Sequence, residues 1–161
     1  MGFTEPQIKV LSGKLRAKHV KTRQQYGMTL SYIEGWQVIA EANRIFGFDG
    51  WDRETVANNC VSEERQKGRH HCAYVSRVRI RVRAGDREIV REASGYGQGL
   101  GTMSGEAHES ALKEAETDAM KRALITFGNP FGLALYDKEQ RGVRGRKCEG
   151  NGRPVTWSVV S

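Results

Sequence analysis

The sequence predicts an α+β fold in which two N-terminal helices precede an antiparallel three-stranded sheet and a long helix follows it. Two observations predict this class. Hydrophobic residues recur at helical spacing up to residue 46 and again after residue 106, whereas residues 51–94 alternate with a period of two. Because the helices flank the strands instead of alternating with them, we expect them to cover one face of the sheet. The 161 residues are enough for one domain whose core needs no disulfide or metal.

The first helix is predicted for residues 5–19. Thr4 and Gln7 have the form of a capping box, which places the start of the helix directly after Thr4. The hydrophobic residues that recur at helical spacing are Ile8, Leu11 and Leu15.

The second helix is predicted for residues 33–46, after a polar and basic stretch over 20–31 that indicates a loop or a short strand. Gly47 follows its last turn, where glycine commonly ends a helix. The face expected to point toward the core carries Trp36, Ile39, Ala40, Asn43 and Phe46.

Three strands are predicted over residues 51–61, 70–83 and 87–94, joined by a polar turn over 62–69 and a tight turn at Gly85-Asp86. Such short turns join antiparallel neighbours, so the strands form a meander. Alternation in the middle strand places Tyr74, Val78, Ile80 and Val82 on one face and Arg77, Arg79, Arg81 and Arg83 on the other.

The arginine face has two interpretations of equal weight. A two-residue loop at Gly85-Asp86 sets Arg83 opposite Glu88 and Arg79 opposite Glu92, so that part of the face neutralises itself. Arg77 and Arg81 then remain open for DNA or for a neighbouring subunit.

The glycine-rich residues 95–105 indicate a flexible or tightly bent linker, because glycine tolerates unusual backbone angles. A long helix follows over residues 106–127 and ends at Gly128-Asn129-Pro130. The core-facing residues of this helix are Ala107, Ala111, Ala115, Met120, Ala123, Leu124 and Phe127. We expect one domain over residues 1–138 and a basic, flexible tail over 139–161.

Several kinds of catalytic or cofactor site are disfavoured. No Gly-Lys-Ser/Thr occurs, as a phosphate-binding loop requires, and no Gly-x-Ser-x-Gly occurs, as a nucleophile elbow requires. Cys60 and the run His70-His71-Cys72 lack the spacing of a zinc site. Asp86 and Glu88 lie two apart, as in some metal-dependent nucleases, but without a matching lysine. We therefore predict no catalytic residue, no metal, no cofactor and no enzymatic activity.

The cellular location is predicted from what the sequence lacks. The N-terminus does not have the form of a secretory signal, and no apolar run reaches the length of a membrane span. The three cysteines, Cys60, Cys72 and Cys148, show no disulfide spacing, so free thiols in a reducing compartment are expected. We predict a cytoplasmic protein associated with DNA.

The charge pattern favours nucleic acid as the partner. Lys and Arg total 26 against 19 acidic residues, a net charge of +7, and a basic domain attracts polyanions. On the last helix, a stripe with four-residue spacing runs about 12 Å along one edge, the length of about two phosphate spacings. Its residues are Glu109, Lys113, Thr117 and Lys121, flanked by Arg122. These side-chain types hold phosphates, although a solvated helix face stabilised by ion pairs has the same pattern.

Four segments, in order between residues 5 and 138, closely resemble the N-terminal annealing domain of the Rad-fifty-two family. They are the Tyr-Ile-Glu-Gly-Trp run over 32–39, the Asn-Arg-Ile-Phe-Gly-Phe-Asp-Gly-Trp run over 43–51, Gly95-Tyr96-Gly97, and residues 113–124 with Phe127-Gly128-Asn129. The resemblance implies a β-β-β-α unit, a ring of identical subunits, and ATP-independent annealing of single-stranded DNA in homologous recombination and double-strand break repair. It also implies a groove that holds the DNA backbone while the bases face outward.

The resemblance also assigns residues and partners. The groove residues it implies are Arg23, Glu109, Lys113, Thr117, Lys121 and Arg122, and a possible second, outer DNA site has Lys67 and Arg69. A single-strand-binding protein or a recombinase is the implied protein partner.

Three departures suggest weaker or shifted DNA contacts. Family basic residues are replaced by Thr29 and Ile125, and the lysines expected between Gly101 and Glu106 are missing. The family's long C-terminal region does not follow, so we expect a compact phage-like or bacterial annealer. The alternatives are a DNA-processing nuclease and an RNA- or DNA-binding module without annealing activity.

Overall fold

The computed structural model describes residues 2–145 and 158–159. The helices are α1 (Glu5–Ser12), α2 (Gly35–Phe46) and α3 (Ser104–Ile125), with short 3₁₀ turns at Ala17–His19, Asn129–Phe131 and Leu133–Tyr136. The strands are β1 (Leu15–Arg16), β2 (Lys21–Gln25), β3 (Met28–Tyr32), β4 (Trp51–Gln66), β5 (Arg69–Ala84), β6 (Arg87–Gly101), β7 (Val143–Arg144) and β8 (Ser158–Val159).

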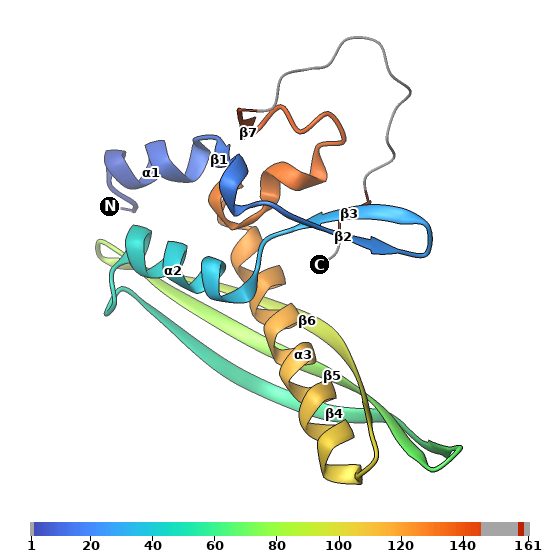
Figure 1. The fold of residues 1–161 in the computed structure, drawn as a ribbon. Helices are drawn as coiled ribbons and strands as arrows, with labels where there is room; N and C mark the ends of the chain where they lie inside the picture. The colour runs from blue at the N-terminus through green and yellow to red at the C-terminus, as the bar shows by residue number, and fades with distance from the viewer. Residues whose placement is uncertain (1, 146–157, 160–161) are drawn as a thin grey trace.

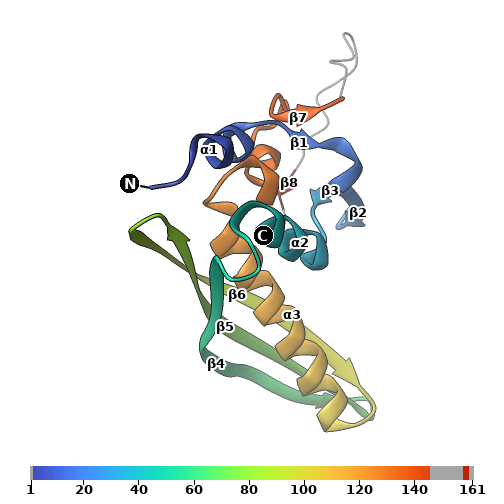
Figure 2. The ribbon, with the colours of Figure 1, turned by 90° about the vertical axis from the view of Figure 1, so that its left-hand side faces the viewer.

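The centre of the fold is a three-stranded antiparallel sheet in the order β4-β5-β6, crossed on one face by α3 (Figures 1 and 2). This arrangement confirms the predicted α+β class and the meander followed by a long helix. Val78, Ile80 and Val82 of β5 are buried against α3, as alternation predicted, and Tyr74 is half-buried. Each core residue predicted for the last helix is buried, including Phe127 just beyond the end of α3.

The N-terminal region differs from its prediction. The capping box at Thr4 is present, but α1 ends at Ser12 instead of continuing to residue 19. After Gly13 the chain is extended, and β1 pairs in parallel with β7. Residues 20–31, predicted as a loop or one short strand, form an antiparallel hairpin of β2 and β3.

The buried face of α2 is rotated from the predicted one. Trp36 and Ala40 are exposed, whereas Val38, Ala42, Ile45 and Phe46 are buried. Phe46 stacks on Phe3 and Phe131 and contacts the edge of Phe127. These partners lie far from α2 in the sequence, on both sides of it, so the sequence of the helix alone does not show which side they cover.

The glycine-rich segment is a strand and not a flexible linker. β6 continues through Gly101, and Gly95, Gly97 and Gly99 face α3. A Cβ at these positions would lie within 2.2 Å of Ala119 N, 2.3 Å of Ala111 O and 1.8 Å of Ala107 O, respectively. Two strand residues advance about 6.7 Å and four helix residues about 6 Å, so glycines at every second strand position meet alanines at every fourth helix position.

The polar segment over 62–69 is also more regular than predicted. β4 continues to Gln66, and only Lys67 and Gly68 form the turn into β5. Both residues have positive φ, 51° and 75°, as a two-residue hairpin loop requires.

The arginine face is neutralised within the chain. The predicted pairing of Arg79 with Glu92 and of Arg83 with Glu88 across β5 and β6 is confirmed as strand register. The prediction that Arg77 and Arg81 remain open is wrong. Arg77 contacts Glu92 at 2.6 Å, Arg81 contacts Glu54 at 3.1 Å and Glu88 at 3.5 Å, and Arg83 contacts Asp52 at 2.6 Å. The additional acids come from β4, whose register the sequence did not show.

The residues after 138 only partly fall within the described ranges. Gln140 and Val143 are buried, and Val143 belongs to the main hydrophobic core. Ser158 and Val159 pair in parallel with β3. The remaining residues of the predicted tail, including Arg146, Lys147 and Cys148, lie outside the described residues. Within the described part of the chain, none of the helices has the length and apolar character required to cross a lipid bilayer.

Candidate nucleic-acid interface

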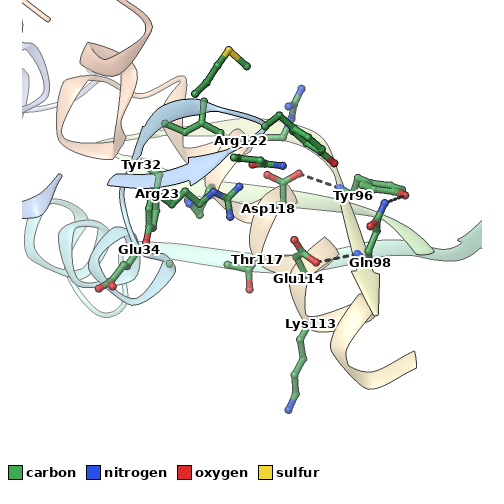
Figure 3. A pocket seen from close by; sticks show the side chains of 16 residues that line it. Arg23, Tyr32, Glu34, Tyr96, Gln98, Lys113, Glu114, Thr117, Asp118 and Arg122 are labelled. Carbon is green, nitrogen blue, oxygen red and sulfur yellow. Dashed lines mark hydrogen bonds between the residues drawn. The ribbon is translucent and has the colours of Figure 1, made fainter. Parts of the chain in front are cut away.

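A groove of about 1020 Å³ lies between the β2–β3 hairpin, β6 and the side of α3 that faces away from the core (Figure 3). The hairpin is distant in sequence from the other two walls, β6 and α3, which follow each other along the chain. The residues that line it are Arg23, Gln25, Tyr26, Met28, Leu30, Tyr32, Glu34, Gly35, Tyr96, Gln98, Lys113, Glu114, Thr117, Asp118, Lys121 and Arg122.

The ring of Tyr32 joins cations from two walls of the groove. The guanidinium carbon of Arg23 lies 5.6 Å from the centroid of the ring, and Nζ of Lys121 lies 5.5 Å from the same centroid. Both distances fall within cation–π range, so the ring holds two positive groups together that would otherwise repel each other. An anion entering here meets both charges at once.

Lys121 is partly withdrawn from water. Burial lowers the pKa of its ammonium group, and the nearby charge of Asp118 partly opposes this shift. A desolvated cation has lost hydration that a bound phosphate would replace, so Lys121 is a suitable anion contact.

The stripe on α3 is largely in the groove. Lys113, Thr117, Lys121 and Arg122 all line it. Glu109 does not line it, but its Oε1 accepts a 2.5 Å hydrogen bond from Nζ of Lys113, and this bond lowers the pKa of the Glu109 carboxyl. Glu109 therefore affects the groove through Lys113. A ligand that binds Lys113 would have to compete with this ion pair.

Two carboxylates on α3 cover the open edge of β6. Asp118 Oδ2 accepts a hydrogen bond from the backbone N–H of Tyr96 at 3.0 Å, and Glu114 Oε2 accepts one from the N–H of Gln98 at 2.9 Å (Figure 3). Unpaired N–H groups on an edge strand invite pairing with other chains, and these two are occupied. The acids thus fix the sheet to the helix, although they also place negative charge in the groove.

Asp118 is in an unfavourable position for a charged group. Its Oδ1 is buried with no hydrogen-bond partner among the described residues, and burial raises the pKa of the carboxyl in spite of the Tyr96 hydrogen bond and the charges of Arg122 and Lys121.

The start of α2 packs closely on the groove. A Cβ on Gly35 would lie 2.8 Å from the methyl group of Thr117. Glycine at this position therefore lets the helix approach α3, and Glu34 before it accepts a hydrogen bond from the indole N–H of Trp36 at 2.5 Å.

Some of the residues considered in the sequence lie away from the groove. Lys67 and Arg69, assigned to a possible outer site, are exposed at the β4–β5 turn and do not line it. Thr29 lies on β3, where its hydroxyl accepts a hydrogen bond from Gln24 Nε2, and Ile125 packs near Gly132. Among the described residues, no three His, Cys, Asp or Glu side chains gather as a metal site would require.

Sequence reasoning identified five of the sixteen lining residues, namely Arg23, Lys113, Thr117, Lys121 and Arg122, and missed the other eleven. Among the missed residues, Tyr32 lies in a segment that carried the family resemblance. Tyr96 and Gln98 lie in the glycine-rich segment that the sequence predicted as a linker. Alternation over β6 would have indicated Tyr96 and Gln98, because residues between the buried glycines must point outward. Asp118 and Glu114 gave no comparable signal, since their partners are backbone groups.

The fold and the groove define an α+β protein whose cationic surface suits an extended polyanion. Residues 5–151 match the model of the Rad52/22 family double-strand break repair protein, so this chain belongs to that family.

Individual relatives agree with the match. The chain is 39% identical over 142 residues to the DNA repair and recombination protein RAD52 of Eremothecium gossypii, which covers 86% of this chain and 32% of the relative. It is 37% identical over 135 residues to the protein of the same name in Saccharomyces cerevisiae, and the match covers 80% of this chain and 27% of the relative. It is 38% identical over 133 residues to the DNA repair and recombination protein rad22 of Schizosaccharomyces pombe, and that match covers 80% of this chain and 28% of the relative. The chain spans about a third or less of the length of these relatives. They are fungal, and the expected phage or bacterial origin stays a prediction.

Proposed function

We propose that the chain binds the backbone of single-stranded DNA in the groove and anneals complementary strands without nucleotide hydrolysis, in DNA recombination and repair. The observation that carries the proposal is the convergence of Arg23 from β2 with Lys113, Thr117, Lys121 and Arg122 from α3 on one groove. These are the side chains that hold phosphates without reading bases. The names of the relatives, DNA repair and recombination proteins, support the same process.

The mechanism follows from charge neutralisation. Two DNA strands repel each other through their phosphates, and cations that neutralise one strand lower this repulsion. Base pairing itself is favourable, so the protein needs only to hold a strand extended with its bases accessible. No catalytic residue is required, and we propose none.

Assembly would extend the groove. β4 is one of the two edge strands of its sheet, and each residue from 56 to 66 is exposed, since α3 covers mainly β5 and β6. We propose that a second copy of the chain covers this strand in a closed ring, so that grooves of successive subunits follow one another.

Other parts of the proposal rest on the family resemblance. We propose Lys67 and Arg69 as an outer DNA contact and a location on cellular DNA. We propose residues 1–138 as the main part of the annealing domain. Residues 139–145 are not separate from it, because Val143 lies in its core and β7 pairs with β1. A single-strand-binding protein or a recombinase is the proposed protein partner.

The first test is annealing of two complementary labelled oligonucleotides without ATP or metal, at two salt concentrations. We expect faster annealing that weakens as salt rises. The absence of acceleration would contradict the proposal. In a separate incubation with Mg²⁺, shortening of the DNA would contradict it as well.

A pair of double variants then tests the groove. Lys121→Ala with Arg122→Ala should lower single-strand affinity at least about ten-fold. It should also reduce the slope of log affinity against log salt by about 1.4, which corresponds to two lost phosphate contacts. The matched control, Arg77→Ala with Arg81→Ala, removes the same charge from the neutralised face and should leave both quantities nearly unchanged. Equal losses in the two double variants would mean that net charge, and not the groove, governs binding.

A further inference from the structure

Tyr26 stands at the tip of the β2–β3 hairpin in a conformation that its side chain disfavours. Gln25 pairs with Met28, so Tyr26 and Gly27 form a two-residue loop. Their φ angles are 50° and 74°. Such loops favour Asn, Asp or Gly at both positions, because a positive φ strains other residues. An aromatic residue here is not explained by the turn.

Burial does not explain Tyr26 either. Its side chain is 90% exposed, the most exposed large hydrophobic side chain in the described part of the chain. The equivalent loop position between β4 and β5 has nearly the same φ, 51°, but holds Lys67, a polar residue of the kind expected in an exposed turn. Tyr26 therefore contributes neither to the core nor to the local conformation, which points to a role outside the folded chain.

The surroundings of Tyr26 indicate what it contacts. It lines the groove together with Arg23 of its own hairpin and the cations of α3. Tyr96 of β6 also lines the groove and is about half exposed, and its hydroxyl accepts a 2.8 Å hydrogen bond from Gln98 Nε2 that holds the ring in place. The groove thus combines a cationic surface on α3 with aromatic rings on the hairpin and on β6.

We infer that Tyr26 stacks on a base of the bound strand, one base for each subunit, and sets the position of the strand along the groove. This inference rests on the proposed function, which places the phosphates against α3. An extended strand held there would direct bases away from the cations, where an exposed ring is available. Stacking uses the face of a base and tolerates any sequence, so the pairing edge stays open to a complementary strand.

The test compares two ligands of equal length and charge: oligo-deoxythymidylate and an abasic oligonucleotide with the same sugar-phosphate backbone. Tyr26→Asn removes the ring and inserts a residue that the loop favours, so the variant should fold at least as well as the original chain. Its affinity for oligo-deoxythymidylate should fall about five-fold or more, as expected for one lost stacking contact, while its affinity for the abasic ligand and its salt dependence stay unchanged.

Two further variants sharpen the result. Tyr26→Trp keeps an aromatic ring and should retain the affinity for oligo-deoxythymidylate. Phe48→Asn removes another strongly exposed aromatic side chain, 88% exposed and outside the groove lining, and should not distinguish the two ligands.

The outcomes separate this inference from the proposed function. If Tyr26→Asn binds both ligands as the original chain does, or loses affinity for both equally, the stacking inference is wrong. A loss of single-strand affinity in the Lys121 and Arg122 double variant would still support DNA binding in the groove. If the original chain binds neither ligand, the proposed function fails and the inference fails with it.

Discussion

At the scale of single residues, Asp118 opposes the function proposed for the groove that it lines. Burial is the main cause of its raised pKa. A carboxyl whose pKa is raised by folding contributes stability below its unfolded pKa, and this contribution is lost as the pH rises through the folded pKa. At neutral pH, the charged Asp118 therefore weakens both the fold and the attraction for an anion. Its structural contribution beside the cations of the groove is that Oδ2 accepts a hydrogen bond from the N–H of Tyr96.

We predict that Asp118→Asn stabilises the protein at neutral pH and increases single-strand affinity by about two- to ten-fold, a change of roughly one kcal/mol as for a charged contact near a surface. The amide oxygen can still accept the Tyr96 hydrogen bond. Denaturant unfolding should show a larger gain at pH 7 than at pH 4. The control is Glu114→Gln, which changes the neighbouring, more exposed edge contact and should alter stability less. A variant less stable at pH 7 would show that the Asp118 charge is required by the fold.

Lys121 predicts a pH dependence of binding. Because burial lowers the pKa of its ammonium group, Lys121 loses its charge at a lower pH than an ordinary lysine does. We expect affinity for oligo-deoxyadenylate, whose bases do not ionise in this range, to decline as the pH rises from 7 toward 10. Lys121→Arg should remove most of this decline, since a guanidinium stays protonated. Lys113→Arg, at an exposed position of the same stripe, is the control, and an equal effect in both variants would argue against the buried position as the cause.

At the scale of elements, the contact between β6 and α3 depends on the absence of side chains. We predict that Gly97→Ala destabilises the fold by about 1–3 kcal/mol, because the added methyl group would lie 2.3 Å from Ala111 O and the backbone must shift. Gly105→Ala is the matched control. Nothing lies within 4 Å of its added methyl group, and it replaces a helical glycine, so it should be neutral or stabilising by up to about 1 kcal/mol. Urea unfolding measures both, and equal effects would contradict the packing argument.

The same elements show what the sequence could predict. The period of two located β5 and its hairpin register with β6, because both depend on neighbouring residues. The partners of the arginines required the register of β4, which contains two irregularities, after Thr55 and after Cys60. The glycines of β6 were interpreted as a linker because only the tertiary contact with α3 shows why a strand lacks side chains.

At the scale of the whole molecule, the sequence again predicted the part of the site that depends on neighbouring residues and missed the part that depends on tertiary contacts. Helical spacing alone identified Lys113, Thr117 and Lys121 as one stripe, and the structure places them in one groove. Tyr32, which holds Arg23 near Lys121, was not predicted as a site residue, since the approach of the hairpin to α3 is a tertiary contact.

The last prediction concerns assembly. Val56 and Val61 are the extra residues at the two irregularities of β4, and both are exposed although they are large and apolar. Bulges redirect side chains, and an exposed outer strand with apolar side chains is a site for contact with another chain. We expect sedimentation velocity to detect a closed oligomer of the original chain. Val56→Asp with Val61→Asp should shift it toward folded monomers, because burying carboxylates at a subunit contact is costly.

Ile8→Asp is the matched control for this assembly test. It places one carboxylate, against two in the double variant, on α1 at a side chain that is 53% exposed, against 54% for Val61. Because α1 lies away from β4 (Figure 1), this control should keep the oligomer. A monomeric original chain at all concentrations would contradict the ring. An oligomer that persists in the double variant would mean that subunits meet through a surface other than β4, and the groove would then continue from subunit to subunit along a different path.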